Sequence, residues 1–539
     1  MKINGNVVDI HVRSIYAACV TIENGKVKKI EKIEGSGVGF IIPGLIDAHI
    51  HIESSMITPG AFAVEAVKHG TVATVSDPHE IANVCGIEGV DFMIEDAARV
   101  PLKMFFGAPS CVPATSFETN GASLDKDDVR EMLQRNEIKY LSEMMNFPGV
   151  IHDDEQVHNK ILYARKFGKP IDGHAPGLTG RDLEKYVSAG ISTDHECSTI
   201  NEALEKISLG MKILIREGSA AKNLDSLKEL YNMFPDQIML CSDDLHPEML
   251  LKGHINKLIA RLISEGYNLF DVIRSATINP GKHYNIDTGL LREGDNADLI
   301  LVDDLESMNI LETWIDGKKV FDRGIVAFNA GHSRGINNFN CSIITNDNIQ
   351  VVNQGKKIRI IEAYDGDLLT KEKIISTGSV EILRADTDLD HLKIVVKDRY
   401  NDTAPVCGFV KGFNLKRGAF AGSVAHDSHN IICVGTNDND IVSAVNKVIE
   451  MKGGLSFACD NKIYAIKLNI GGIMTSNSCR ETAHEYEKLN EIVKKMGCTM
   501  SAPFMTLAFM ALLVIPDLKI GDRGLFDVNK FGLVPLFVE

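Results

Sequence analysis

The chain has 539 residues, 44% hydrophobic and 24% charged, which are ordinary values for a globular protein and exclude a disordered or fibrous one. Its net charge is −16 and no Lys/Arg-rich run offsets this, so nucleic acid and membrane surfaces are not expected as partners. The eleven cysteines are scattered without a C-x-x-C pair, and the first residues lack a signal-peptide pattern, so we expect a reduced, cytoplasmic protein.

Two short pieces rich in strand-forming residues flank the central part of the chain. Residues 1–39 are expected to form strands broken by a turn at Asn24-Gly25. Residues 286–335 show the same strand-like pattern, with a turn at Asp316-Gly317. We predict that the two pieces pair into one small β-sandwich.

Between residues 40 and 285, eight short apolar runs alternate with stretches of helix-like apolar spacing. The runs are residues 39–42, 72–75, 103–106, 138–141, 170–173, 190–193, 211–215 and 237–241, and polar residues follow nearly all of them. Strands that alternate with helices form a parallel sheet, and eight such units fit a closed (β/α)8 TIM barrel. The fold class is therefore α/β, with the active site expected at the carboxyl ends of the strands.

The last part of the chain, residues 336–539, alternates strand-like and helical segments with turns at residues 437–439 and 453–454. We interpret it as an additional C-terminal α+β domain. Its apolar stretch from Phe504 to Ile515 is too short to span a bilayer, and we expect it to be a buried helix with no functional role.

His49 and His51 are two residues apart and follow the first predicted strand. Residues at this spacing in a strand point to the same face. Two imidazoles there are natural ligands for a first-row divalent metal, although an H-x-H pair also occurs by chance. Matching strand ends carry Glu143, His174, His195 and Asp243. We therefore predict a metal site at the barrel mouth. If it holds two ions, a carboxylate such as Glu143 can give one oxygen to each.

Several motifs give the chain a resemblance to a known family. Residues 43–51 (PGLIDAHIH), 275–281 (SATINPG) and 294–300 (GDNADLI) resemble motifs of the amidohydrolase superfamily. Within that superfamily, residues 70–84, 143–150 (EMMNFPGV), 173–176 (GHAP), 242–247 (SDDLHP) and 424–430 (VAHDSHN) resemble the bacterial adenine deaminases. The resemblance covers essentially the whole chain.

The resemblance implies a centre of two divalent metal ions per chain and a homodimer. His49, His51 and Asp243 would hold one ion, His174 and His195 the other, and Glu143 would bridge them where many relatives use a carboxylated lysine. The family leads us to expect manganese, with iron or zinc possible. The implied reaction is hydrolytic deamination of adenine to hypoxanthine and ammonia, a step of purine salvage.

Such a reaction needs groups that take a proton from water and protonate the ring and the leaving amine. Asp243 is our candidate for proton shuttle as well as ligand; the alternative is a ligand alone. Asp77, His79 and Glu80 are expected to contact the purine or to tune the metal site; the alternative is a local turn in which His79 and Glu80 pair.

Other polar residues have open roles. Asp194 and Glu196 could orient imidazoles or be solvated, and for Arg216 we favour a salt bridge over substrate binding. The segment His426-Asp427-Ser428-His429 could bind metal, reach the barrel mouth, or be a polar surface turn.

Two alternatives compete with the deaminase. A cyclic-amide hydrolase of the dihydroorotase or hydantoinase kind would share the fold and the metals, but Glu143 in place of a lysine bridge and the Ser76–Glu80 motif count against it. A catalytically silent scaffold is disfavoured because all six predicted ligands are present.

Overall fold

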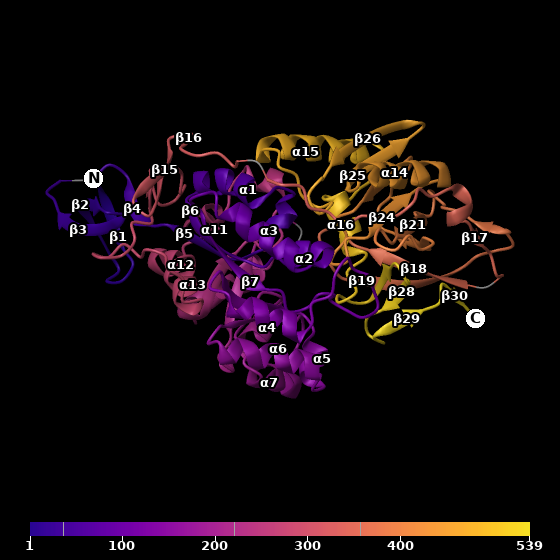
Figure 1. The fold of residues 1–539 in the computed structure, drawn as a ribbon, viewed down its shortest axis with the longest axis horizontal. Helices are drawn as coiled ribbons and strands as arrows, with labels where there is room; N and C mark the ends of the chain where they lie inside the picture. The colour runs from indigo at the N-terminus through magenta and orange to yellow at the C-terminus, as the bar shows by residue number, and fades with distance from the viewer. Residues whose placement is uncertain (36, 220, 332, 356) are drawn as a thin grey trace.

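The computed structural model describes residues 1–35, 37–219, 221–331, 333–355 and 357–539. Three parts follow one another along its longest axis: a sheet that holds the N-terminus, a central barrel and a tail domain that holds the C-terminus (Figure 1). Within these ranges, every helix is too short or too polar to cross a membrane.

The flanking pieces join in one sheet, which has eight strands in the described residues. Its order is β16 (Ile325–Val326), β15 (Lys318–Asp322), β14 (Ile310–Ile315), β13 (Leu299–Val302), β4 (Phe40–Pro43), β1 (Lys2–Asp9), β2 (Ser14–Glu23) and β3 (Lys26–Lys32). The two pieces meet where β4 pairs antiparallel with β13, with Ile42 opposite Ile300.

The first predicted barrel strand was wrong in position. Residues 40–43 belong to the flanking sheet as β4, and the first barrel strand is β5 (Leu45–Ile50). The break falls at Gly44, where a Cβ atom would lie 2.3 Å from the Val72 side chain, so only glycine fits between the two strands.

In the part of the chain that the structure describes, eight parallel strands in two arcs build the barrel wall. The first arc is β5, β6 (Thr71–Ser76), β7 (Lys103–Ala108), β8 (Ile138–Met144) and β9 (Ile171–Gly173), and the second is β10 (Thr193–Asp194), β11 (Lys212–Arg216) and β12 (Ile238–Cys241). Ser192 N–H donates to the Ile171 carbonyl at 3.0 Å, and Asp243 N–H donates to the His49 carbonyl at 2.9 Å, which joins the arcs on both sides. The predicted TIM-barrel fold is confirmed.

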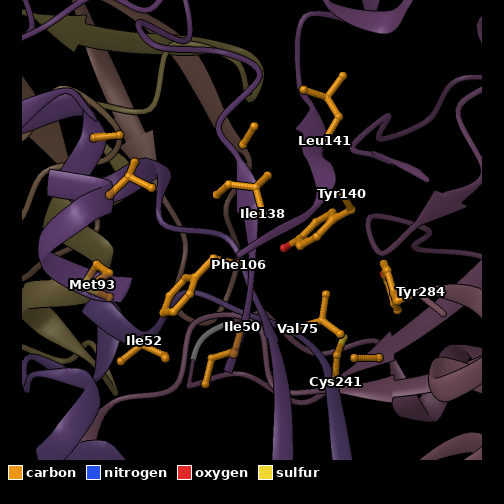
Figure 2. Close-up of a cluster of buried hydrophobic side chains, with 14 of the residues drawn as sticks. Ile50, Ile52, Val75, Met93, Phe106, Ile138, Tyr140, Leu141, Cys241 and Tyr284 are labelled. Atoms are coloured by element: carbon orange, nitrogen blue, oxygen red, sulfur yellow. The ribbon is translucent and has the colours of Figure 1, made fainter. Parts of the chain in front are cut away.

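Helices follow the strands and cover the outside of the barrel (Figure 1). They are α1 (Pro59–Ala66), α2 (His79–Cys85), α3 (Ile87–Ala97), α4 (Lys126–Gln134), α5 (Phe147–Ile151), α6 (Glu155–Lys166), α7 (Gly180–Ser188), α8 (Ile200–Ser208), α9 (Leu224–Leu227), α10 (Pro247–Leu250), α11 (Ile255–Ser264), α12 (Leu269–Ser275) and α13 (Ile278–His283). In α11 the buried Ile255, Ile259 and Leu262 recur at helical spacing and form one apolar face. Strand side chains such as Val75, Phe106 and Tyr140 belong to the same buried core cluster (Figure 2).

The tail domain is built on a nine-stranded sheet, as far as the described residues show. The order is β19 (Thr370–Ser376), β18 (Lys357–Ala363), β22 (Val406–Lys411), β21 (Leu392–Lys397), β24 (Ile431–Gly435), β23 (Ala419–Gly422), β25 (Gly454–Cys459) and β26 (Lys462–Lys467), with β30 (Phe537–Val538) also on β18. Its helices are α14 (Asp438–Met451), α15 (Cys479–Lys495) and α16 (Pro503–Phe509), and β27 (Leu518–Gly521), β28 (Gly524–Asp527) and β29 (Gly532–Val534) form a small separate sheet.

Candidate metal centre and active site

Six predicted ligands converge at the carboxyl ends of the barrel strands. They are His49 on β5, His51 directly after it, Glu143 on β8, and His174, His195 and Asp243 just after β9, β10 and β12. Each is at most 8% exposed. The barrel thus gathers residues that are nearly 200 positions apart in the chain into one buried cluster.

The first group within the cluster consists of His49, His51 and Asp243. The two Nε2 atoms of the histidines lie 3.2 Å apart, and Asp243 Oδ1 lies 3.6 Å from the first and 3.3 Å from the second. His51 Nδ1 lies 3.1 Å from the Asp77 carbonyl oxygen. When Nδ1–H donates to that carbonyl, the lone pair of Nε2 is left facing the cluster.

Glu143 faces both groups with different oxygens. Its Oε1 lies 3.3 Å from His51 Nε2, whereas its Oε2 lies 2.8 Å from His174 Nδ1 and 3.2 Å from His195 Nε2. The carboxylate therefore has the orientation that a bridge between two cation sites requires.

The donor set fits divalent metal ions. Ligand atoms about 2.1 Å from one ion lie roughly 3.0–3.4 Å from each other, and most separations in the cluster fall close to that range. Imidazole nitrogen and carboxylate oxygen without thiolate are accepted by manganese, iron and zinc alike. Nε2 of the buried His174 also has no hydrogen-bond partner among the described residues.

The electrostatics of the cluster favour positive charge. Burial alone would raise the pKa of Glu143, but His174 and His195 hold it well below its usual range. Burial likewise would lower the pKa of His195, but Glu143 raises it to about 9. The Glu143 carboxylate is thus ionised at neutral pH, as a carboxylate that binds a metal ion must be.

Asp77, His79 and Glu80 lie together at the edge of this cluster, at the end of β6 and the start of α2. His79 Nδ1 is 3.2 Å from Asp77 Oδ2 and 3.5 Å from Glu143 Oε1, and its Nε2 is 3.4 Å from Glu80 Oε1. All three side chains are buried. His79 therefore pairs with Glu80 and also lies beside the candidate metal ligand Glu143, so the two alternatives for these residues do not exclude each other.

Arg216, at the end of β11, forms the salt bridge that we favoured. It donates from Nη1 to Glu196 Oε1 at 2.5 Å and from Nη2 to Glu196 Oε2 at 2.9 Å. Glu196 is buried and its Oε1 lies 3.5 Å from His174 Nδ1 and 3.4 Å from His195 Nε2. The alternative of a solvated Glu196 is wrong, and so is that of a solvated Asp194, which is fully buried beside Lys206.

The tail domain covers the barrel mouth. The cavity over the six candidate ligands is lined from the tail side by Leu368, His426, Asp427, Phe509, Leu512 and Ile515. The surface-turn alternative for residues 426–429 is therefore wrong, since His426 and His429 are buried and contact Glu80. The apolar stretch from Phe504 is a buried helix only to Phe509, and it also lines the cavity, which sequence reasoning missed.

Lys519 on β27 fixes two of these apolar residues. Its fully buried Nζ donates to the carbonyl oxygens of Leu368 at 2.7 Å and of Phe509 at 3.1 Å. The apolar ceiling, defined here as Leu368, Phe509, Leu512 and Ile515, is thereby tied to the small sheet of the tail. In the sequence, Lys519 stands out only as a polar residue between apolar ones. This pattern does not predict its contacts with the two carbonyl oxygens.

Comparison with known proteins covers the whole chain. The sequence model of the amidohydrolase family matches residues 40–320, and that of the adenine deaminase C-terminal domain matches residues 367–532. The chain is 50% identical to the adenine deaminase of Methanosarcina barkeri over 99% of this chain and 98% of that one, and 50% identical to that of Methanosarcina mazei over 100% of both. The crystal structure of a β-aspartyl dipeptidase from Fervidobacterium islandicum AW-1 has 15% identity and a TM-score of 0.46, and covers 60% of this chain and 98% of its own.

Proposed function

Because the chain belongs to the adenine deaminases within the amidohydrolase family, we propose that it hydrolyses adenine to hypoxanthine and ammonia with the residues assigned below. The observation that carries this assignment is the identity of about one half to adenine deaminases along the full chain. The cyclic-amide alternative is not favoured. It would leave unexplained why the C-terminal segment matches the adenine deaminase model.

The proposed ligand set has two parts joined by Glu143. His49, His51 and Asp243 hold one divalent ion, and His174 and His195 hold the other. The opposed orientation of the two Glu143 oxygens supports the bridging role. Divalent ions at such a site lower the pKa of bound water toward neutrality and so supply the nucleophile at pH 7.

The reaction adds water to C6 of the purine, and the C6–N bond then breaks as ammonia leaves. Asp243 is ionised, because Arg216 holds its pKa well below the usual range against the effect of burial, and it accepts the proton of the attacking water. His79 and Glu80 line the same cavity. Burial alone would lower the pKa of His79, but Asp77 and Glu80 hold it well above its usual range, so His79 can give a proton to the ring or to the departing amine. The ionised Glu80 carboxylate can accept a hydrogen bond from the purine amine. Asp77 orients His79 through the contact at 3.2 Å.

The apolar ceiling provides a face for a flat ring. A purine held between Phe509 and the metal cluster would be shielded from water on the tail side, which strengthens every electrostatic contact below it. The ceiling would thus supply the shielding from water that the barrel residues alone do not provide.

Adenine turnover tests the proposal. Protein purified without metal is loaded with Mn²⁺, hypoxanthine is followed by ultraviolet absorbance, ammonia by a coupled assay, and bound metal is counted. We expect equal amounts of hypoxanthine and ammonia with about two ions per chain. Turnover of dihydroorotate or hydantoin in place of adenine would overturn the substrate but keep the metal centre.

Four finer assignments belong to the same proposal: manganese as the resident metal, a homodimer, a cytoplasmic location and a role in purine salvage. We also propose three domains, formed by residues 1–39 with 286–335, residues 40–285 and residues 336–539. Metal analysis after growth in different metals and the mass of the protein in solution test the first two.

A further inference from the structure

The carboxylate of Glu80 is held from both sides by one segment of the tail domain. His426 Nδ1 lies 2.6 Å from Glu80 Oε1, and His429 Nε2 contacts Glu80 Oε2. Glu80 is 2% exposed and the two histidines are 4% and 1% exposed. Each oxygen of the carboxylate therefore contacts a different histidine, and all three side chains are buried.

The tail domain fixes the His426 ring and the backbone of the segment that carries both histidines independently of Glu80. The Phe509 ring stacks on His426 with a centroid distance of 4.9 Å and an interplanar angle of 23°. Tyr400 O–H donates to the Ser428 carbonyl at 2.7 Å, and His429 N–H donates to the Ala425 carbonyl at 2.7 Å. His426 is thus held by the Phe509 ring, and His429 is carried by a braced loop, with Glu80 as the hydrogen-bond partner of its ring among the described residues.

Glu80 in turn depends on the two histidines. It lies in the first turn of α2, and its nearest other ionisable partner is His79, whose Nε2 is 3.4 Å from Oε1. A buried carboxylate needs donors for its oxygens, and loss of a donor leaves an unsatisfied group that turns toward other partners. Without the tail histidines, Glu80 would have no fixed direction relative to the cavity that it lines.

We propose that His426 and His429 are positioning residues that clamp the Glu80 carboxylate in its orientation toward the purine and so make deamination depend on the tail domain. The inference rests on the proposed function, in which Glu80 serves the reacting ring. Each histidine needs one N–H donor for this task, and a neutral imidazole supplies one.

Pairs of variants of similar shape distinguish the loss of an N–H donor from a loss of folding stability. An Asn amide reproduces Nδ1 and a Gln amide reproduces Nε2, so His426→Asn and His429→Gln keep an N–H toward Glu80, whereas His426→Leu and His429→Met do not. We expect the Leu and Met variants to lower kcat/KM for adenine by about 10- to 100-fold, the scale of a misplaced reacting group. The Asn and Gln variants should recover most of this loss. Lys393→Met, which removes a buried tail lysine paired with Asp438, controls for a weakened tail domain.

A double-mutant cycle with Glu80→Gln decides whether the histidines act through Glu80. If they do, His426→Leu has little further effect once the carboxylate is gone. An equal loss in the wild-type and Glu80→Gln backgrounds, or equal activity of the Leu and Asn variants, would overturn the clamp. Loss of one bound metal ion in both His426→Leu and His429→Met would also overturn it, because the segment would then be a metal site. Failure of the wild type to deaminate adenine would be distinguishable, since it would remove the proposed function instead.

Discussion

Arg216 donates from Nη1 to Oδ2 of Asp243 at 2.5 Å, on the carboxylate oxygen opposite to the one that faces the histidines. Asp243 Oδ1 is consequently left to His49 and His51. The aspartate has a φ of 57°, in the left-handed region that an L residue seldom adopts and that Asp tolerates better than most. The backbone conformation and the ion pair together hold this carboxylate in one direction.

Removal of the Arg216 guanidinium should destabilise the protein strongly. Arg216→Met leaves the buried carboxylates of Glu196 and Asp243 without their guanidinium partner, and we expect the free energy of unfolding of the metal-free protein to fall by about 3–5 kcal/mol. Urea denaturation measures this. Arg261→Met is the control, because Arg261 is 38% exposed and its surface ion pairs should contribute less than about 1 kcal/mol. Equal stability of the two variants would contradict the prediction.

The proposed ligands should be indispensable for turnover. Glu143→Ala and Asp243→Ala are expected to lower kcat for adenine by at least about 100-fold and to reduce the bound metal below two ions per chain, with the circular dichroism of the fold retained. Glu217→Ala, which alters a carboxylate 3.8 Å from Lys222 outside the cavity lining, should remain active. Near-normal activity in either ligand variant would refute the ligand set.

Lys519 should make stability depend on pH. Burial lowers the pKa of Lys519 to about 7, whereas a lysine in an unfolded chain titrates near about 10.4. Between these values the unfolded chain binds the proton and the folded chain does not. The free energy of unfolding therefore rises with pH from about 7 to 10, by at most about 1.4 kcal/mol per unit from this group. Below pH 7 both states are protonated and the contribution is constant.

The comparison of wild type with Lys519→Met isolates this contribution. Between pH 7.5 and 9.5 the wild type should gain about 2 kcal/mol more stability than the variant in urea unfolding. Lys416→Met, at an exposed position, controls for the loss of one lysine. Parallel pH profiles of the wild type and Lys519→Met would show that the buried amine does not titrate in this window.

The apolar ceiling should govern substrate affinity. Phe509→Leu keeps an apolar side chain but removes the ring, and ring stacking on a base contributes about 1–3 kcal/mol. We expect KM for adenine to rise about 10-fold with a smaller change in kcat. Phe413→Leu is the matched control, since Phe413 is a buried ring in the tail core outside the cavity lining. A similar rise in KM in both variants would assign the effect to tail stability.

The barrel, and the convergence of the proposed ligands at its mouth, could be predicted from local rules. Parallel strands end at one edge, so polar residues such as Glu143, His174 and Asp243 that follow apolar runs must meet there. The first strand was misplaced by a few residues, because the run at 39–42 is as apolar as a barrel strand. Its assignment to the flanking sheet depends on pairing with Leu299–Val302, which no local pattern reveals.

The tail side of the site could not be predicted for the same reason. His426 and Phe509 reach the barrel mouth because the tail domain packs on the barrel. Neither the hydrophobic periodicity nor the spacing of residues in the sequence predicts this packing. The charged residues of the segment 426–429 suggested a site, but only the fold shows that Glu80 is their partner.

Glu80 and its two histidines are 346 and 349 residues apart in the chain. During synthesis a ribosome therefore completes the barrel first, and about 200 residues more must be added before the last of the ceiling, Ile515, emerges, which takes on the order of tens of seconds. A nascent chain that ends before residue 426 would carry all six proposed ligands but would lack the two histidines and most of the ceiling, so we expect it to deaminate adenine far more slowly than the full chain. The side chains that cover the mouth are thus among the last to be made, and full activity is expected only after they have been added.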